Sequence, residues 1–195
     1  SGPNIAAEIA AGWYAETVIA CKDHTVAEMC REIFAVPYRF APYASDDVVG
    51  VELGGALKNI VAIACGMVDG LGLGDNTKTA VIHQGFEEMV EIGLHYGARR
   101  ETFYGLAGVF DLYVTCNSRF SRNRLVGERV AQGKALNAVL SELVAEKRGE
   151  PEGPEMAKVV YELNGRLSLG VTKAVYDALF SGRSALECVQ GLFKG

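Results

Sequence analysis

An apolar run from Val48 to Leu73 constrains the fold of this chain more than any other feature. The run is too long for a strand, and Asp46 or Asp47 can cap it, so it predicts a helix that ends near Val68. A helix that is apolar on most of its faces must be buried. We therefore expect it to lie inside a helical domain.

Lys58 is the unusual residue of this run, because burying an ammonium group without a partner is costly. Gly54 and Gly55 precede it and remove side-chain bulk, so another group can approach the backbone there. Asn59 follows with an amide side chain. Two interpretations fit: Lys58 belongs to a functional site, or its stem lies along the helix and its charge reaches water. The local sequence favours neither.

Strand and helix signals divide the chain into a short α/β segment and a helical remainder. Strands are predicted at 17–22 and 38–43, and helices at 5–11, 23–34, 76–96, 121–132, 136–147, 154–164, 171–180 and 184–192. The fold class is therefore mainly α. We expect residues 1–44 to be the last part of a larger α/β sheet, and residues 45–195 to form an all-helical domain.

The glycines near the end of the apolar run have two features. Gly66, Gly70 and Gly74 are spaced four residues apart, which on a helix would create a smooth face for close packing. Segment 70–74 alternates glycine and leucine, but it lacks the preceding strand, the GxGxxG spacing and the distant acidic residue of a dinucleotide-binding loop. We interpret it as a break between two helices.

Composition narrows the class of protein. The 195 residues carry a formal net charge of −5 and no basic stripe, which disfavours nucleic-acid binding. No apolar run forms an uninterrupted membrane span, and the first residues do not resemble a signal peptide. The five cysteines are scattered without a CxxC, and the three histidines lack metal-ligand spacing. We therefore expect no metal site, no disulfide framework and a reducing, cytoplasmic location.

A turn-rich segment at 111–124 gathers arginines, asparagines and hydroxyl groups before a predicted helix start. Arginine forks and the backbone N–H groups of a helix start both attract phosphate. We interpret Arg122 and Asn123 as anion ligands, and Arg119 and Arg124 as a solvated basic turn.

These ligands suggest an enzyme for a small phosphorylated substrate. Lys58 would transfer protons, Asp111 would hold its ammonium charged and oriented, and Arg122 would bind phosphate. A carbonyl that is reduced gains negative charge on its oxygen, which a lysine can protonate. The acidic turn at 149–154 needs no such role, because the start of a helix favours negative charge.

Four segments, in this order and spacing, resemble NAD(P)-dependent glycerol-3-phosphate dehydrogenases. They are GGALKN at 54–59, DGLGLGDNTK at 69–78, DLYVTC at 111–116 and SRNR at 121–124, and the opening SGP also matches. The resemblance implies a longer protein, in which an N-terminal Rossmann domain carries the GxGxxG loop. Residues 1–44 would be the last part of that domain, and residues 45–195 would be the helical substrate domain.

The resemblance also implies a role for each matching residue. Lys58 would be the catalytic proton acceptor and donor in the interconversion of glycerol 3-phosphate and dihydroxyacetone phosphate, with Asp111 beside it. Expected substrate contacts are Gly2, Asn4, Lys58, Asn59, Asp111, Thr115, Ser121, Arg122 and Asn123. Expected cofactor contacts are Ala6, Arg122, Glu150 and Glu152. The implied cofactor is NAD or NADP, bound mainly by the upstream region.

Two other interpretations stay open. A helical-domain hydroxy-acid dehydrogenase also places a lysine on a helix, but it lacks the combined DLxxTC and SRNR segments. The isolated chain can also be a non-catalytic helical module, since it has no region for the nicotinamide ring and pyrophosphate; we expect it to be inactive alone. An exposed sheet edge invites self-association, so we expect a homodimer.

Overall fold

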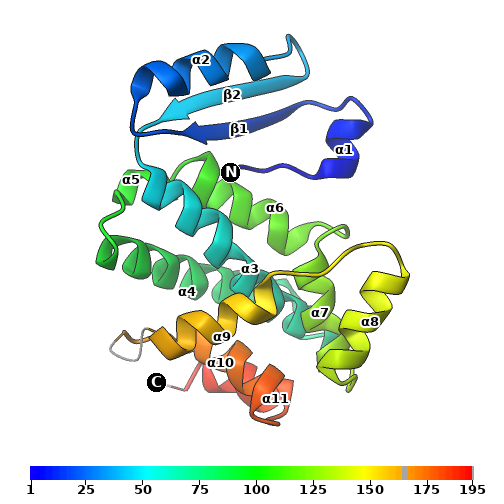
Figure 1. The fold of residues 1–195 in the computed structure, drawn as a ribbon. Coiled ribbons are helices and arrows are strands. Elements are labelled where there is room, and N and C mark those ends of the chain that lie inside the picture. The colour runs from blue at the N-terminus through cyan, green and yellow to red at the C-terminus, as the bar shows by residue number, and fades with distance from the viewer. Residues whose placement is uncertain (164–166, 195) are drawn as a thin grey trace. The chain divides into compact units, whose positions relative to one another are not determined.

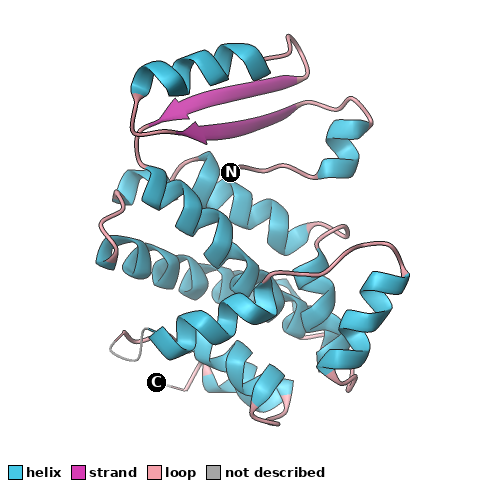
Figure 2. Ribbon diagram, viewed as in Figure 1, coloured by secondary structure: helices cyan, strands magenta, loops and turns pink. Residues whose placement is uncertain are grey.

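The computed structural model describes residues 1–163 and 167–194, which are mainly helical with two strands near the N-terminus (Figures 1 and 2). This confirms the predicted fold class. The elements are, in chain order, α1 (Ala6–Ala10), β1 (Ala15–Ala20), α2 (His24–Phe34), β2 (Phe40–Ser45), α3 (Val48–Gly70), α4 (Gly74–His95), α5 (Arg100–Phe103), the π-helix η1 (Leu106–Phe110), α6 (Asp111–Asn117), α7 (Arg122–Ala131), α8 (Leu136–Ala145), α9 (Gly153–Leu163), α10 (Gly170–Phe180) and α11 (Ala185–Gly191).

Two compact units make up the chain, and each is described by itself. The first comprises Ser1–Gly55 and Met89–Val114, and the second comprises Ala56–Glu88 and Thr115–Gly195. The boundaries fall inside the helices α3, α4 and α6. The boundary expected after residue 44, between the last part of a nucleotide-binding domain and the helical domain, stays a prediction.

In the first unit, β1 and β2 pair in parallel, with Ala15 opposite Phe40 and Ala20 opposite Ser45. Parallel strands need a crossover connection, and α2 provides it. Asp23 caps this helix by accepting a hydrogen bond from Thr25 N at 2.9 Å. The strands lie two residues away from their predicted bounds. For β2 the reason is a tight turn at Tyr38, whose φ is +61°, so the extended backbone begins only at Phe40.

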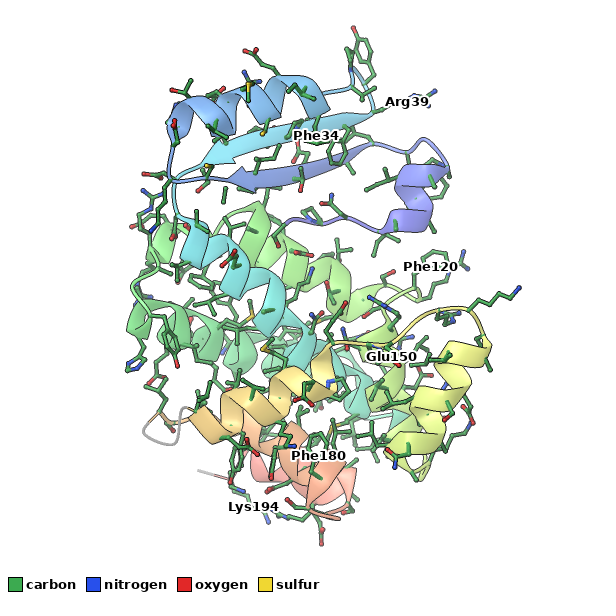
Figure 3. The ribbon with its side chains drawn as sticks, viewed as in Figure 1. Phe34, Arg39, Phe120, Glu150, Phe180 and Lys194 are labelled. Carbon is green, nitrogen blue, oxygen red and sulfur yellow. The ribbon has the colours of Figure 1, made fainter. Side chains whose placement is uncertain are left out.

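Helix α2 carries an apolar stripe at helical spacing, but the structure leaves that stripe exposed. Val26, Met29 and Ile33 are 40%, 54% and 68% exposed, whereas Ala27 is fully buried. Figure 3 labels Phe34 at the end of the same helix, and this side chain is exposed as well. The helix therefore packs on its sheet through the edge of its apolar face.

Asp47 anchors the start of α3 in the first unit, which confirms one of the two predicted caps. Its carboxylate accepts hydrogen bonds from Gly50 N at 2.9 Å, Arg99 N at 3.0 Å and Thr102 Oγ1 at 2.5 Å. Burial alone would raise the pKa of Asp47, but these hydrogen bonds outweigh it and hold the pKa below its usual value. One charged side chain thus joins α3 to the segment that enters α5.

The region expected to be turn-rich is helical at its start, so that expectation is wrong for residues 111–117, which form α6. The preceding π-helix η1 contains a kink at Gly108. A Cβ on Gly108 would lie 2.0 Å from the carbonyl oxygen of Phe103, so only glycine fits. Sequence periodicity does not detect such a short, kinked connection between helices.

In the second unit, α3 and α7 pack backbone to backbone through glycines on both helices. A Cβ on Gly66 would lie 1.9 Å from Arg124 O, and one on Gly70 would lie 2.4 Å from Glu128 O. From the other helix, a Cβ on Gly127 would lie 1.9 Å from Ile63 O. The predicted smooth face is therefore confirmed for Gly66 and Gly70.

Gly74 does not belong to that face, so this part of the prediction is wrong. Helix α3 ends at Gly70 and α4 begins at Gly74, which confirms the predicted helix break. Gly72 and Gly74 have φ values of +66° and +81°, a left-handed conformation that glycine adopts without strain.

By length and composition α3 could cross a membrane, which corrects the expectation that no segment passes this test. However, 61% of its most apolar window is buried inside the protein. Residues 60–68 are all nearly inaccessible. These properties are those of a core helix, as the opening prediction requires.

We expect Gly66→Ala to destabilise the 195-residue chain, because the added methyl group would collide with the backbone of α7. Overpacking typically costs about 1–3 kcal/mol of unfolding free energy. Urea denaturation followed by circular dichroism measures the loss. Gly191→Ala is the matched control: nothing lies within 4 Å of its Cβ position in α11, so its stability should be equal or slightly higher. Equal stability of the two variants would contradict the close contact.

Candidate functional site

A buried pair of amide side chains forms the centre of the candidate site in the second unit. Asn123 Nδ2 donates a hydrogen bond to Asn59 Oδ1 at 2.9 Å, and Asn123 Oδ1 accepts one from Gly153 N at 2.9 Å. Asn59 is 9% exposed and Asn123 is 4% exposed. Because a backbone N–H can only donate, the second bond fixes which way the Asn123 amide points. One side chain thus links α3, α7 and the start of α9.

Arg122 holds the turn that precedes α9. Its Nη1 donates to Glu150 O at 2.7 Å, and its Nη2 pairs with Glu152 Oε1 at 3.2 Å. Gly149 has a φ of +78°, and a Cβ there would lie 3.2 Å from Arg122 Nη1. Figure 3 labels Glu150 on this turn between α8 and α9. The acidic turn and the arginine, which the sequence presents as separate features, are therefore one assembly.

Ser121 is the N-cap of α7, which confirms the predicted helix start. Its Oγ accepts a hydrogen bond from Arg124 N at 3.3 Å, and the residue is 7% exposed. Arg122 and Asn123 are therefore the first two residues of a ten-residue helix. The partial positive charge at this helix start favours a bound anion.

Arg124 is not the solvated residue expected from the sequence. Its side chain is only 14% exposed, and its Nη1 pairs with Asp69 Oδ2 at 2.7 Å and Glu128 Oε2 at 3.0 Å. The error arises because its partners lie on α3 and one turn further along α7. Arg119 does match the expectation: it is exposed and lies over the Phe120 ring, 4.9 Å from the centroid.

Lys58 and Thr115 are half-buried residues of the same unit, on α3 and α6. Lys58 directly precedes Asn59, whose side chain belongs to the amide pair. Cys116 follows Thr115 and is fully buried. Burial first, and then a hydrogen bond with Cys65, raise the pKa of the Cys116 thiol well above its usual value. This thiol is therefore a packing group and not a nucleophile.

The remaining predicted contacts lie in the first unit. A Cβ on Gly2 would lie 2.9 Å from Thr17 Cα, so the segment before α1 packs directly on β1. Asn4 Nδ2 donates to Glu16 O at 2.8 Å. Asp111 is 2% exposed and accepts a hydrogen bond from Ser1 Oγ at 3.1 Å. Ala6 is exposed at the start of α1.

Lys58 and Asp111 belong to different compact units. Their predicted meeting therefore stays a prediction. Gly54 and Gly55 do admit close neighbours within the first unit: Cβ atoms there would lie 2.2 Å from Ala107 O and 2.7 Å from Ser1 Oγ. Here the approaching groups come from the chain itself. Among the described residues, no group of three or more His, Cys, Asp or Glu side chains is placed to hold a metal ion.

Comparisons with known proteins agree with these features. A family model described as the C-terminus of NAD-dependent glycerol-3-phosphate dehydrogenase matches residues 47–190. The protein named glycerol-3-phosphate dehydrogenase (NAD(P)+) from Nitratidesulfovibrio vulgaris is 44% identical over 98% of this chain and 57% of its own length. Its namesake from Gloeobacter violaceus is 48% identical over 88% of this chain and 54% of its own length.

Solved structures show the same likeness. The crystal structure of glycerol-3-phosphate dehydrogenase from Coxiella burnetii superposes with a TM-score of 0.93 at 32% identity, over all of this chain and 59% of that one. The enzyme from Saccharomyces cerevisiae gives a TM-score of 0.86 at 31% identity, over all of this chain and 58% of that one.

The fold is thus that of the helical C-terminal part of a dehydrogenase. The chain belongs to the NAD-dependent glycerol-3-phosphate dehydrogenase family, as its four sequence segments predict. It spans 57% and 54% of the lengths of these two curated relatives. NAD or NADP, the cofactor expected from the sequence, is the one in the relatives' names.

Proposed function

We propose that this chain provides the substrate-binding and proton-transfer part of an NAD(P)-dependent glycerol-3-phosphate dehydrogenase. The observation that carries the proposal is a pair of contacts among α3, α7 and the turn before α9: Asn123 bonds to Asn59, and Arg122 bonds to Glu150. The family resemblance assigns all four of these residues to substrate or cofactor. An exposed sheet edge and the scattered cysteines support a homodimer in the cytoplasm as its setting.

Arg122 is the proposed phosphate ligand, and its present partners leave it able to act as one. The guanidinium has five N–H donors, and the Glu150 carbonyl and the Glu152 carboxylate occupy only two of them. The pair with Glu152 joins side chains that are 35% and 62% exposed, so it contributes about 0–1 kcal/mol. A phosphate dianion that binds the fork in a bidentate manner is the stronger partner. It can therefore displace Glu152 while the Glu150 carbonyl keeps the guanidinium oriented.

Lys58 is the proposed proton-transfer group. In the oxidation of glycerol 3-phosphate, its amine would take the proton of the secondary hydroxyl; in the reverse reaction, its ammonium would return that proton to the carbonyl oxygen. The bound cofactor supplies the acceptor or donor of the hydride. Asn59, next to Lys58, would orient the reacting oxygen with its amide, because Asn123 already holds that amide in place.

The turn at 149–153 fits the cofactor in its chemistry. Glu150 and Glu152 are exposed, and carboxylates accept hydrogen bonds from ribose hydroxyl groups. Both are held next to Arg122, so the proposed phosphate ligand and the proposed cofactor contacts share one support.

We expect the 195-residue chain alone to show no turnover, because the proposal assigns most of the cofactor contacts to an upstream region. The assay is oxidation of NADH or NADPH with dihydroxyacetone phosphate. A chimera that places the upstream part of the Nitratidesulfovibrio vulgaris relative before Ser1 should restore activity. It should act on glycerol 3-phosphate and not on hydroxy acids. Rapid turnover by the chain alone, or a preference for hydroxy acids, would refute the corresponding part of the proposal.

In that chimera, Lys58→Ala should lower kcat by about 10²–10⁴-fold, the usual contribution of a general acid or base. The KM for dihydroxyacetone phosphate should change far less, because Arg122 is retained. Lys158→Ala is the control, since this lysine is exposed on α9. A Lys58→Ala variant with near-normal kcat would exclude the proton-transfer role.

Arg122→Ala should raise the KM for dihydroxyacetone phosphate by roughly 10- to 100-fold, because hydrogen bonds to a charged group are worth about 1.5–3 kcal/mol. Arg119→Ala is the matched control, because this arginine is exposed and stacks on Phe120. Glu152→Gln removes the ion pair with Arg122 but keeps the guanidinium, so it should leave this KM unchanged or lower it slightly, because phosphate no longer has to displace a carboxylate. If Glu152→Gln raises it as much as Arg122→Ala does, Arg122 acts only as an anchor for the turn.

A further inference from the structure

A half-buried cluster of charges lies next to the proposed anion site and includes Asp69 and Lys78, the two ends of segment 69–78. Asp69, near the end of α3, accepts hydrogen bonds from two cations with the same oxygen. Its Oδ2 lies 2.9 Å from Lys78 Nζ and 2.7 Å from Arg124 Nη1. Lys78 and Arg124 are only 12% and 14% exposed, and Asp69 is 26% exposed. The cluster therefore joins α3, α4 and α7 in a setting that water screens poorly.

Arg124 connects this cluster to the start of α7. Its Nε donates to Ser118 O at 3.2 Å in the loop before the helix, and its Nη1 pairs with Glu128 Oε2 at 3.0 Å. Its backbone N–H donates to the cap Ser121. Its carbonyl oxygen lies 1.9 Å from the position that a Cβ on Gly66 would take. The residue directly after Arg122 and Asn123 is thus held by both its side chain and its backbone.

The geometry points to Asp69 as a positioning residue of the anion site: it holds Arg124, and through Arg124 it fixes the first turn of α7, which carries Arg122 and Asn123. This inference rests on the proposed function. The cluster of Asp69, Glu128, Lys78 and Arg124 contains two negative and two positive charges. Arg124 is therefore neutralised, and it serves the site by holding the helix in place, while Arg122 remains the phosphate ligand.

Asp177 provides an unusually close control in the same compact unit. Its Oδ2 also accepts from one lysine and one arginine, Lys173 Nζ at 2.6 Å and Arg183 Nη1 at 3.0 Å. Its side chain is 8% exposed. All three residues lie in or just after α10, and within the described residues none of them makes a hydrogen bond or ion pair with α7. Asp69→Asn and Asp177→Asn thus remove the same charge from the same kind of pair.

The test measures binding of inorganic phosphate to the 195-residue chain by NMR, together with urea unfolding. The probe signals are the backbone amides of residues 121–124 and the Arg122 Nε–H. Asp69→Asn should weaken phosphate binding by about tenfold, comparable with the loss when the outer partner of a metal ligand is removed. It should also shift the amide signals of residues 121–124 before any phosphate is added. Asp177→Asn should lower stability and leave both phosphate readouts as in the parent chain.

Each outcome decides the inference. Phosphate binding by Asp69→Asn that equals or exceeds that of the parent chain overturns it, as does an equal loss in Asp177→Asn. If Asp69→Asn does not fold, Glu128→Gln, which removes the second carboxylate on Arg124, is judged by the same two readouts. If Arg122→Ala also leaves phosphate binding unchanged, the proposed anion site fails with it. A loss in Arg122→Ala but not in Asp69→Asn overturns the positioning role alone.

Discussion

The backbone contact between α3 and α7 is the constraint on which the second unit depends. At Gly66, Gly70 and Gly127 the opposing backbone lies so close that a Cβ atom would not fit. Helices usually pack with their axes 8–10 Å apart because side chains lie between them, and glycines allow a closer approach. Only because the backbones touch can a side chain as short as Asn123 reach Asn59 across the crossing.

Polar groups then determine how α7 is oriented at this contact. On one side, Asn123 bonds to Asn59 and Gly153, and on the other, Arg124 bonds to Asp69. Apolar packing alone tolerates small rotations of a helix, whereas hydrogen bonds between buried groups have strict geometry and a high cost when they are lost. The candidate site is therefore held by a few polar contacts around a glycine contact.

Glycines at α3 serve different purposes along its length. Gly54 admits the carbonyl oxygen of Ala107 in the first unit, whereas Gly66 admits that of Arg124 in the second. The first unit is held in a comparable way, since the buried carboxylate of Asp47 joins α3 to residues near α5. In both units a short-range polar contact secures the position that apolar burial alone leaves loose.

The sequence by itself determined the helical fold class, the helix break after Gly70, the helix start near Ser121 and the family. Each of these depends on local patterns: apolar periodicity, glycine conformation, a capping hydroxyl or a set of short segments. Only the tertiary structure decided that Arg124 is half-buried and ion-paired while Arg119 is exposed, and that Arg122 holds the acidic turn. Those outcomes depend on partners 28 to 55 residues away, such as Glu150 and Asp69. No local pattern can reveal a contact whose two halves meet only after the helices have packed.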